Sequence, residues 1–224
     1  IVMFIKAIIQ CRMSSHRFPG KVLAPFLGKP ILAHIIDCIK RTQINSSIIL
    51  ATSDEKVDDP LATYGKYLGI DVVRGPRDDV LERFAKTLKK HKCDAFFRIC
   101  GDSPLLLPLL FNQALLIYNN SSYDLVTNIF PRTFPVGMSV ELIKTKRFLE
   151  TKEKIVKKID REHLTRYFYQ NSKDFQIYNM ECGKSINLDY KLAVDEIKDL
   201  KRLESWFLNK GDQYENLFPI KVLK

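Results

Sequence analysis

The stretch FIKAIIQCRMSSHRFPGK, residues 4–21, decides how the chain folds. It opens with an apolar, isoleucine-rich run at residues 4–9, which is typical of a buried strand. A loop at residues 12–21, here called the basic loop, follows this run directly and contains three basic residues. Because ligands of open α/β sheets bind at the carboxyl ends of the strands, we expect the chemistry of the protein in this loop.

Outward from this stretch, the first half of the chain alternates between two patterns. Apolar, β-branched runs predict further strands, and segments of helical period between them predict helices. Pro30, Asp58 and Asp78 suit helix starts, and Gly69 suits a helix end. This alternation predicts an α/β fold with a mostly parallel, doubly wound sheet. The expected strands are residues 47–51, 70–73 and 95–99, and the expected helices are residues 30–41, 58–68 and 79–91.

The second half is less regular, and its aromatic stretch at residues 128–137 indicates a subdomain inserted before the last core elements. No repeat, low-complexity tract or linker divides the chain, so we expect a single domain over residues 1–224. The expected helices are residues 108–119, 160–170 and 196–207, and the expected strands are residues 123–127, 138–143, 175–180 and 192–194.

Composition narrows the function classes. The 224 residues are 46% hydrophobic and carry a formal net charge of +10, which implies an anionic partner. The lysines are scattered along the expected helices, as at residues 86–92 and 152–158, and indicate solvated faces. No basic block alternates with aromatic residues, so we expect no nucleic-acid groove.

The cysteines and the hydropathy pattern exclude other classes. Five widely spaced cysteines form no C-x-x-C pair, which argues against a zinc site and a disulfide framework and indicates a reducing cytoplasm. No apolar run approaches the roughly 20 residues that cross a bilayer, so we expect no membrane anchoring. The first ten residues suit a core strand better than a signal peptide.

The basic loop has the composition of a polyphosphate site. Arg12, Arg17 and Lys21 supply fixed positive charge, and Ser14 and Ser15 supply hydroxyls. The glycine at position 20 allows close backbone approach. The loop is neither a Walker A loop nor a Rossmann G-x-G-x-x-G motif. Taken alone, its spacing also fits a solvated basic turn.

The basic loop and a series of further motifs resemble the cytidylyltransferases that make CMP-sugars, including the 3-deoxy-manno-octulosonate (KDO) and acylneuraminate enzymes. The resemblance is strongest to the spore-coat polysaccharide biosynthesis protein F group. It follows the chain in order over nearly its whole length and rests on RMSSHRFPGK (12–21), GKPIL (28–32), ATSD (51–54), DDPL (58–61), RG (74–75), DDVL (78–81), GDSPL (101–105), RT (132–133), REH (161–163) and VD (194–195).

The resemblance implies a Rossmann-like nucleotidyltransferase fold of α/β/α type with a small inserted subdomain for dimerisation and substrate. It divides the domain into a nucleotide-binding half at about residues 1–127, an acceptor-binding and dimerisation segment at about 128–190, and a closing strand and helix at about 191–224. It also implies a homodimer and a role in surface polysaccharide or glycan synthesis.

Two aspartates stand at the ends of expected strands. Asp102 follows Gly101 after the strand at residues 95–99, and Asp195 follows the apolar run at residues 192–194. Mg²⁺ is usually held by one or two carboxylates together with substrate phosphates and water. The resemblance implies that Asp102 and Asp195 share this cofactor. On their positions alone, Asp102 also suits a turn cap and Asp195 a helix N-cap.

The resemblance assigns the remaining candidates to two sides of the site. Arg12, Lys21, Asp102 and Asp195 are the expected catalytic residues, and Arg132 or Arg161 is the expected partner of a sugar carboxylate. The expected nucleotide contacts are Arg12, Ser14, Ser15, Arg17, Lys21, Ser53, Asp79, Arg83 and Gly101. The expected acceptor contacts are Asn128, Arg132, Thr133, Glu141, Arg161 and His163, although His163 also suits an ordinary polar position on a helix.

The chain departs from the resemblance at three positions on the acceptor side. Val136 and Ser139 stand where acidic residues are usual, and Arg166 stands where proline is common. The expected reaction is transfer of CMP from CTP to a sugar acid. The alternatives are a nucleotidyltransferase with another nucleotide or acceptor, a degenerate nucleotide-binding protein without catalysis, and, from charge alone, a nucleic-acid-binding module.

Overall fold

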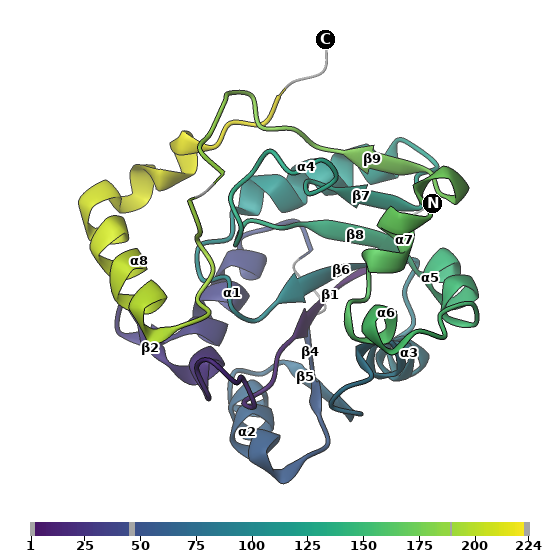
Figure 1. The fold of residues 1–224 in the computed structure, drawn as a ribbon, viewed down its shortest axis with the longest axis horizontal. Coiled ribbons are helices and arrows are strands. Elements are labelled where there is room, and N and C mark those ends of the chain that lie inside the picture. Colours follow the sequence, from purple (N-terminus) through teal and green to yellow (C-terminus); the bar gives the residue numbers. More distant parts are fainter. Residues whose placement is uncertain (1–2, 45–47, 189, 222–224) are drawn as a thin grey trace.

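The structure is a computed structural model that describes residues 3–44, 48–188 and 190–221. Within these residues a seven-stranded sheet crosses the molecule (Figure 1). Strand β8 is antiparallel to both of its neighbours, and the other strands run in one direction. In hydrogen-bonded order the strands are β5 (Asp71–Gly75), β4 (Ile48–Ser53), β1 (Ile5–Gln10), β6 (Ala95–Cys100), β8 (Glu141–Lys144), β7 (Leu125–Thr127) and β9 (Ile177–Asn179).

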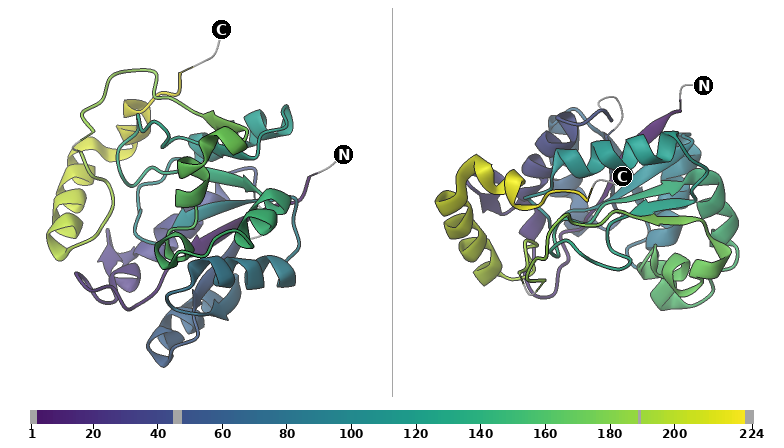
Figure 2. Two further views of the ribbon diagram at one scale, coloured as in Figure 1. Left: turned by 45° about the vertical axis from the view of Figure 1, so that its right-hand side comes forward. Right: turned by 90° about the horizontal axis from the view of Figure 1, so that it is seen from above.

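Helices cover both faces of this sheet, because successive strand residues point to opposite sides. In β1, Ala7 and Ile9 belong to one apolar core and Ile8 to the other. Figure 2 shows the two helical layers from other directions. The first core packs against α1 (Ile31–Lys40), α2 (Asp59–Tyr67), α4 (Pro108–Asn119) and α8 (Ile197–Lys210), and the second against α3 (Val80–Lys90), α5 (Thr145–Lys152) and α7 (Arg166–Gln170), with α6 (Lys158–Glu162) beside α3. The predicted α/β/α class is confirmed.

Short elements complete the fold. Strands β2 (Pro25–Phe26) and β3 (Lys29–Pro30) form a small antiparallel hairpin beside α1. The expected strand at residues 47–51 is confirmed from Ile48 onward, because residue 47 lies outside the described part of the chain. Gly69 follows α2 with a φ of 72°, in the left-handed region expected for a helix end. The 3₁₀ helices are η1 (Lys21–Leu23), η2 (Lys56–Asp58), η3 (Ser172–Asp174) and η4 (Gly211–Leu217).

The predicted strand at residues 192–194 is wrong. Leu192 and Val194 are fully buried, as the apolar pattern indicates. Their backbone hydrogen bonds, however, go to loops: the Leu192 amide donates to the Val136 carbonyl (2.6 Å) and the Val194 amide to the Asp102 carbonyl (2.8 Å). The segment therefore passes along the edge of the site without joining the sheet.

Other predictions differ from the structure in extent. The helix expected over residues 160–170 is two short helices, α6 and α7, separated by a turn at residues 163–165. The strand expected from residue 138 begins at Glu141, because the Asn128 side chain takes the backbone bonds of Met138 and Val140. Helix α5 was not predicted. The segment at residues 128–190 supplies β8 and β9 to the main sheet, and the predicted division into three parts stays a prediction.

The sheet order places a switch point at β1, which pairs with β4 on one side and β6 on the other. The loops that follow β1 and β6 therefore leave the sheet at its carboxyl edge, where such folds bind ligands. They also lie in close contact, because a Cβ on Gly101 would stand 2.3 Å from the Cβ of Cys11. No helix in the described ranges is long and apolar enough to cross a bilayer.

Candidate active site

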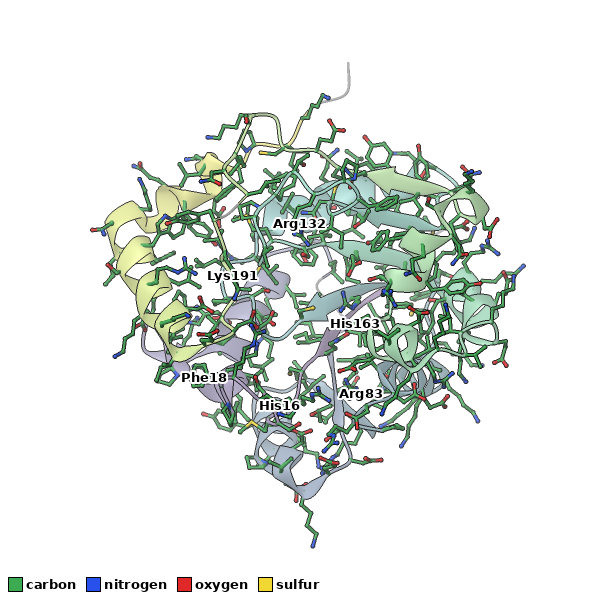
Figure 3. The ribbon with its side chains drawn as sticks, in the orientation of Figure 1. His16, Phe18, Arg83, Arg132, His163 and Lys191 are labelled. Atoms are coloured by element: carbon green, nitrogen blue, oxygen red, sulfur yellow. The ribbon has the colours of Figure 1, made fainter. Side chains whose placement is uncertain are left out.

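A cavity of about 290 Å³ lies at the carboxyl ends of β1 and β6. We call it the basic-loop cavity. Figure 3 shows that His16 and Lys191 lie beside the ends of the central strands, with Arg132 and His163 across from them. The cavity brings together most of the side chains that the sequence assigned to the nucleotide and the metal. Its lining includes Gln10, Cys11, Arg12, Ser14, Ser15, His16, Arg17, Lys21, Cys100, Gly101, Asp102 and Asp195.

Lys21 connects the two candidate metal ligands. Its Nζ lies 3.2 Å from Oδ2 of Asp102 and 3.0 Å from Oδ1 of Asp195, and it also donates to the Val194 carbonyl at 2.8 Å. The Lys21 side chain is only 12% exposed. An ammonium group thus occupies the space between two carboxylates, where a divalent cation with phosphate ligands would also be attracted.

Asp195 is held from its other side as well. Its Oδ2 contacts Nζ of Lys191 at 2.7 Å and a guanidinium nitrogen of Arg17 at 3.1 Å. Burial would by itself raise the pKa of Asp195, but hydrogen bonds from Lys191 and Lys21 outweigh it and lower the pKa to about 2. The carboxylate is therefore ionised at neutral pH.

The donor set fits a magnesium ion that arrives with phosphates. Asp102 and Asp195 offer hard oxygen ligands, and Mg²⁺ takes its remaining ligands from phosphates and water. In the described ranges, no three or more His, Cys, Asp or Glu side chains gather into a cage that would hold a metal alone. Magnesium stays a prediction, and Asp102 and Asp195 are the residues that would hold it.

The basic loop is folded back on itself by internal hydrogen bonds, and a further bond to Asp58 holds it in place. The Met13 carbonyl accepts hydrogen bonds from the amides of Ser15 (2.9 Å) and Gly20 (2.8 Å). The Met13 amide donates to Oδ1 of Asp58 at 2.6 Å. Ser14 lines the cavity, and its buried hydroxyl has no hydrogen-bond partner among the described residues. An unpaired buried hydroxyl of this kind suits a ligand oxygen.

Ser53 supports the basic loop instead of lining the cavity. It is fully buried, and its amide and hydroxyl both donate to Oδ2 of Asp58. Asp58 precedes α2 as expected, but its side chain makes no capping bond there. The Asp58 carboxylate links the end of β4 to the basic loop. The Ser53 side chain is therefore buried away from the cavity, and the predicted contact between Ser53 and a nucleotide is not possible in this structure.

Arg12 leaves the loop toward two acidic side chains. One guanidinium nitrogen lies 3.1 Å from Asp78 and the other 3.5 Å from Glu162. The expectation that Asp78 caps α3 is wrong, because Asp79 is the capping residue and its Oδ1 accepts from the Glu82 amide at 2.9 Å. Asp78 is thereby free to pair with Arg12 at the rim of the cavity.

Asp79 and Arg161, assigned to opposite sides of the site, bind each other. Nε and Nη2 of Arg161 both donate to Oδ2 of Asp79, at 2.9 and 2.7 Å, and Nη1 donates to the Ile155 carbonyl. These bonds tie α6 to the start of α3. The guanidinium of Arg161 is therefore already engaged by protein groups.

Arg83 is also engaged internally. It is 2% exposed, and its Nη1 donates to the carbonyls of Pro76 (3.1 Å) and Arg77 (3.3 Å). Burial lowers its pKa. Arg83 supports the loop that carries Asp78, beneath the surface that a nucleotide would touch.

Cys11 and Cys100 line the cavity without being suited to nucleophilic catalysis. Burial raises the pKa of Cys11 far above its usual value and that of Cys100 to about 11. A buried neutral thiol is a poor nucleophile, because the thiolate is the reactive form. The chemistry of this cavity therefore rests on its charged groups and hydroxyls.

The predicted acceptor residues fall into two groups. Asn128 is fully buried, and its side chain binds the backbone at residues 138–140. Its Nδ2 donates to the Met138 carbonyl at 2.7 Å, and its Oδ1 accepts from the Val140 amide at 2.9 Å. Glu141 is 1% exposed and bonded to Arg98 and Tyr169. Both side chains are therefore buried in internal hydrogen bonds and are not exposed for contact with an acceptor.

The remaining acceptor residues line two further cavities. Arg132 and Thr133 line one of about 470 Å³, the Arg132 cavity, with residues 181–186 on its opposite side. Arg132 donates to Ser139 at 3.1 Å from Nη2, while its Nη1 is buried with no partner among the described residues. The Thr133 hydroxyl accepts from the Cys182 amide at 2.9 Å. His163 lines the other cavity, of about 450 Å³, the Arg98 cavity.

Sequence reasoning missed several residues around the site. Lys191 holds Asp195 and also lies 3.2 Å from Asp199, which forms a capping box with Glu196 at the start of α8. Asp195 is therefore not the N-cap that its position suggested. Arg98 was missed although an arginine inside an apolar strand signals a buried partner, which β8 supplies at Glu141, 2.5 Å away.

Comparison with known proteins gives a consistent picture. Residues 6–223 match the model of the cytidylyltransferase family. The chain is 25% identical to spore coat polysaccharide biosynthesis protein SpsF of Bacillus subtilis, over 92% of this chain and 87% of that protein. It is 31% identical to a 3-deoxy-manno-octulosonate cytidylyltransferase of Geobacter metallireducens, over 50% of this chain and 44% of that protein. A solved cytidylyltransferase structure from Leptospira borgpetersenii superposes with a TM-score of 0.87 at 27% identity, over 93% of this chain and 88% of that one.

Proposed function

The chain belongs to the cytidylyltransferase family, and on that premise we propose that it transfers CMP from CTP to a sugar acid and releases pyrophosphate. It is thus a nucleotidyltransferase enzyme of the type that includes SpsF and the octulosonate cytidylyltransferases. The sugar acid, magnesium, a cytoplasmic location and a role in surface polysaccharide synthesis belong to the proposal.

One observation carries the proposal. Two carboxylates, of Asp102 and Asp195, share the Lys21 ammonium at 3.2 and 3.0 Å inside a cavity that Arg12 and Arg17 also line. A triphosphate needs such a combination of fixed positive charges and, with its metal ion, hard oxygen ligands. The Ser14 hydroxyl, which has no partner in the described part of the chain, adds a hydrogen-bonding group to the same cavity.

In the proposed reaction a hydroxyl oxygen of the acceptor forms a bond to the α-phosphorus of CTP. The bond from that phosphorus to the bridging oxygen breaks, pyrophosphate leaves, and the hydroxyl proton is lost to solvent. Magnesium, when bound, would supply charge neutralisation at the phosphates. Lys21, Arg12 and Arg17 orient the triphosphate and stabilise the negative charge that builds up on the departing pyrophosphate.

Nucleotide binding is the first experiment. Thermal unfolding is followed with CTP, UTP, ATP and GTP, each with and without Mg²⁺. A ligand at about 100 times its Kd stabilises a fold by about 2.7 kcal/mol, which shifts the midpoint measurably. We expect CTP with Mg²⁺ to give the largest shift. Equal shifts with all four nucleotides, or none, would contradict the proposed CTP specificity.

Turnover is measured next as pyrophosphate release from CTP with a panel of sugar acids. An Asp102→Asn variant is expected to lose most of the metal-dependent rate, because one hard ligand is replaced by a neutral amide. Asp54→Asn is the matched control, since Asp54 is an exposed aspartate after β4, outside the cavity lining. Full activity of Asp102→Asn would remove Asp102 from the proposed metal site.

A further inference from the structure

The Arg98 cavity carries an inference that rests on the proposed function and goes beyond it. This cavity of about 450 Å³ is lined by three side chains that can be cationic, Arg98, Arg166 and His163, and by the aromatic rings of Phe130 and Tyr169. No aspartate or glutamate is among the described residues that line it. The cavity is therefore built for an anion that also has an apolar face.

Arg98 is held rigidly at the wall of this cavity. Its Nη1 lies 2.5 Å from Oε2 of Glu141, and its Nε donates to Oε1 of Gln10 at 3.1 Å. Its side chain is 14% exposed, whereas Glu141 is 1% exposed. The carboxylate of Glu141 thus lies behind the guanidinium, and the part of Arg98 that remains accessible is on the cavity side.

Arg166 is anchored in a similar way. Its Nη1 lies 2.8 Å from Oδ1 of Asp160, whose side chain is 6% exposed, while the Arg166 side chain is 39% exposed. Both arginines therefore have a buried carboxylate that fixes one edge of the guanidinium. A guanidinium fixed in this way loses little freedom when its other edge binds a carboxylate.

The aromatic wall is flat. The rings of Phe130 and Tyr169 are stacked with their centroids 4.9 Å apart at 25°, and Phe130 is 38% exposed. The Tyr169 hydroxyl donates to Oε1 of Glu141 at 2.6 Å, and burial together with Glu141 raises its pKa well above the usual value. The phenol therefore stays protonated, and the ring pair offers an apolar face to a bound ligand.

Two contacts join the Arg98 cavity to the basic-loop cavity. Gln10 lines the basic-loop cavity and accepts the bond from Arg98. On the other side Arg12 contacts Glu162, the residue before His163. In a 2-keto sugar acid the carboxylate is bonded to the anomeric carbon, so a carboxylate at Arg98 places the anomeric hydroxyl next to this boundary.

We propose that Arg98 and Arg166 bind the carboxylate of the acceptor and thereby select a sugar acid over neutral sugars. The two arginines predicted from the sequence are less suited to this role. Arg161 is fully engaged by Asp79 and Ile155. Arg132 lines a different cavity, and its Nη2 already donates to the Ser139 hydroxyl at 3.1 Å.

The test compares acids with their methyl esters. Pyrophosphate release from CTP is measured with 3-deoxy-manno-octulosonate, N-acetylneuraminate, the methyl ester of each, and glucuronate, whose carboxylate is remote from the anomeric carbon. We expect the wild-type enzyme to use at least one 2-keto acid with kcat/KM at least about 100-fold above that of its ester, as for loss of a charge-assisted pair. Equal use of an acid and its ester would overturn the proposal.

Variants identify the arginines. Arg98→Lys and Arg166→Lys keep the charge toward Glu141 and Asp160 but lose the planar fork, so each is expected to raise the acceptor KM about 10-fold to 100-fold. The KM for CTP stays within about twofold. Because a merely structural defect lowers acid and ester turnover alike, the decisive readout is a fall in the acid-to-ester ratio.

Controls make each outcome decisive. Lys158→Gln removes a positive charge from an exposed position on α6 outside the cavity lining and should behave as wild type. An unchanged acid-to-ester ratio in both arginine variants, or a fall only in Arg132→Lys, would overturn the proposal. So would CTP binding without turnover of any 2-keto acid in the panel. Absence of CTP binding itself would instead overturn the proposed function.

Discussion

Some side chains in the basic-loop cavity make several contacts at once that no neighbouring side chain makes. Lys21 is the clearest case, because its one ammonium group contacts Asp102, Asp195 and the Val194 carbonyl at once. Arg17, by comparison, is 60% exposed, and among the described residues it forms an ion pair with Asp195. A long side chain enclosed at 12% exposure keeps its charge in one place, which is what stabilisation of a departing phosphate requires.

Replacement of Lys21 should separate chemistry from folding. We expect Lys21→Met to lower kcat by about 10² to 10³, in line with loss of one preorganised charged contact. Single-turnover pyrophosphate release measures this step. Lys29→Met is the control, since Lys29 forms an exposed ion pair with Asp37 outside the cavity. A Lys21→Met enzyme with normal kcat would show that the ammonium group is only structural.

Asp58 is a second residue whose effect should exceed that of its neighbour. It is fully buried and accepts the amides of Met13 and Ser53 as well as the Ser53 hydroxyl. Asp58→Ala leaves these donors without a partner, which costs about 1–3 kcal/mol of unfolding free energy, and it should weaken CTP binding because the basic loop loses its support.

Urea unfolding and CTP titration measure the two effects of Asp58→Ala. Asp59→Ala is the matched control, because Asp59 has a 56% exposed side chain and pairs with Arg74 at the surface. Exposed pairs contribute about 0–1 kcal/mol. Similar losses in both variants would mean that Asp58 has no special role in holding the basic loop.

At the scale of elements, the closing segment at residues 191–195 depends on one glycine. Gly137 has a φ of 104°, and a Cβ there would stand 2.4 Å from the carbonyl carbon of Leu192. The Leu192 amide donates to the carbonyl of Val136 at 2.6 Å. The turn at Gly137 therefore sets the position of the segment that carries Lys191 and Asp195.

Gly137→Ala tests this dependence. The variant combines backbone strain with a backbone clash, so we expect it to destabilise the protein by more than 2 kcal/mol and to weaken nucleotide binding. Gly28→Ala is the control, because Gly28 also has a positive φ, of 84°, but no atom of the described residues lies within 4 Å of its added Cβ. It should show the strain alone, about 1–2 kcal/mol. Equal effects in urea unfolding would argue against the close contact with Leu192.

The strongly periodic elements were predictable from the sequence, because a strand or helix that buries one face carries its own pattern. Strands β1, β4, β5 and β6 and helices α1 to α4 fall where expected. The strand prediction at residues 192–194 was wrong because an apolar run indicates burial but does not show which groups its backbone will hydrogen-bond. The split between α6 and α7 lies in a turn whose Leu164 is fully buried in the second core, a tertiary contact that the helical pattern does not reveal.

The positions of the site residues could be predicted where these residues directly follow a strand. They could not be predicted where two residues meet because neighbouring strands pair in a particular register. The basic loop, Asp102 and Asp195 meet as expected. Ser53, Arg83 and Asn128 stand at the expected positions but point into buried networks. Arg98 was missed because its partner Glu141 is 43 residues away and is brought opposite by the β6–β8 register. Such pairing depends on register, which one sequence does not reveal.

At the scale of the whole molecule, the predicted homodimer remains to be tested. The segment at residues 128–190 exposes apolar side chains on α5, on the chain between α5 and α6, and on α6: Leu149 is 41%, Val156 86% and Ile159 49% exposed. Exposed apolar side chains that gather on one region are typical of protein contacts. We expect this region to contribute to the predicted dimer interface.

Light scattering coupled to size exclusion measures the prediction. Val156→Glu should convert a dimer to a monomer at micromolar concentration, because a charge placed in an apolar interface loses its hydration. Val57→Glu is the matched control, since Val57 is 49% exposed on η2, outside that segment. A wild-type protein that is monomeric, or a Val156→Glu variant that stays dimeric, would rule out this interface.

The contact of Gly101 with Cys11 determines how the cavity is lost when the protein unfolds. The two loops that build the cavity are some 90 residues apart in the sequence and meet only when β1 and β6 are paired along their whole length. Parallel pairing of this kind is non-local and forms cooperatively with the core. The cavity therefore forms only when the central sheet is folded. In a denaturant series, CTP binding and far-UV circular dichroism should disappear together, with no range in which a folded protein has lost its catalytic centre.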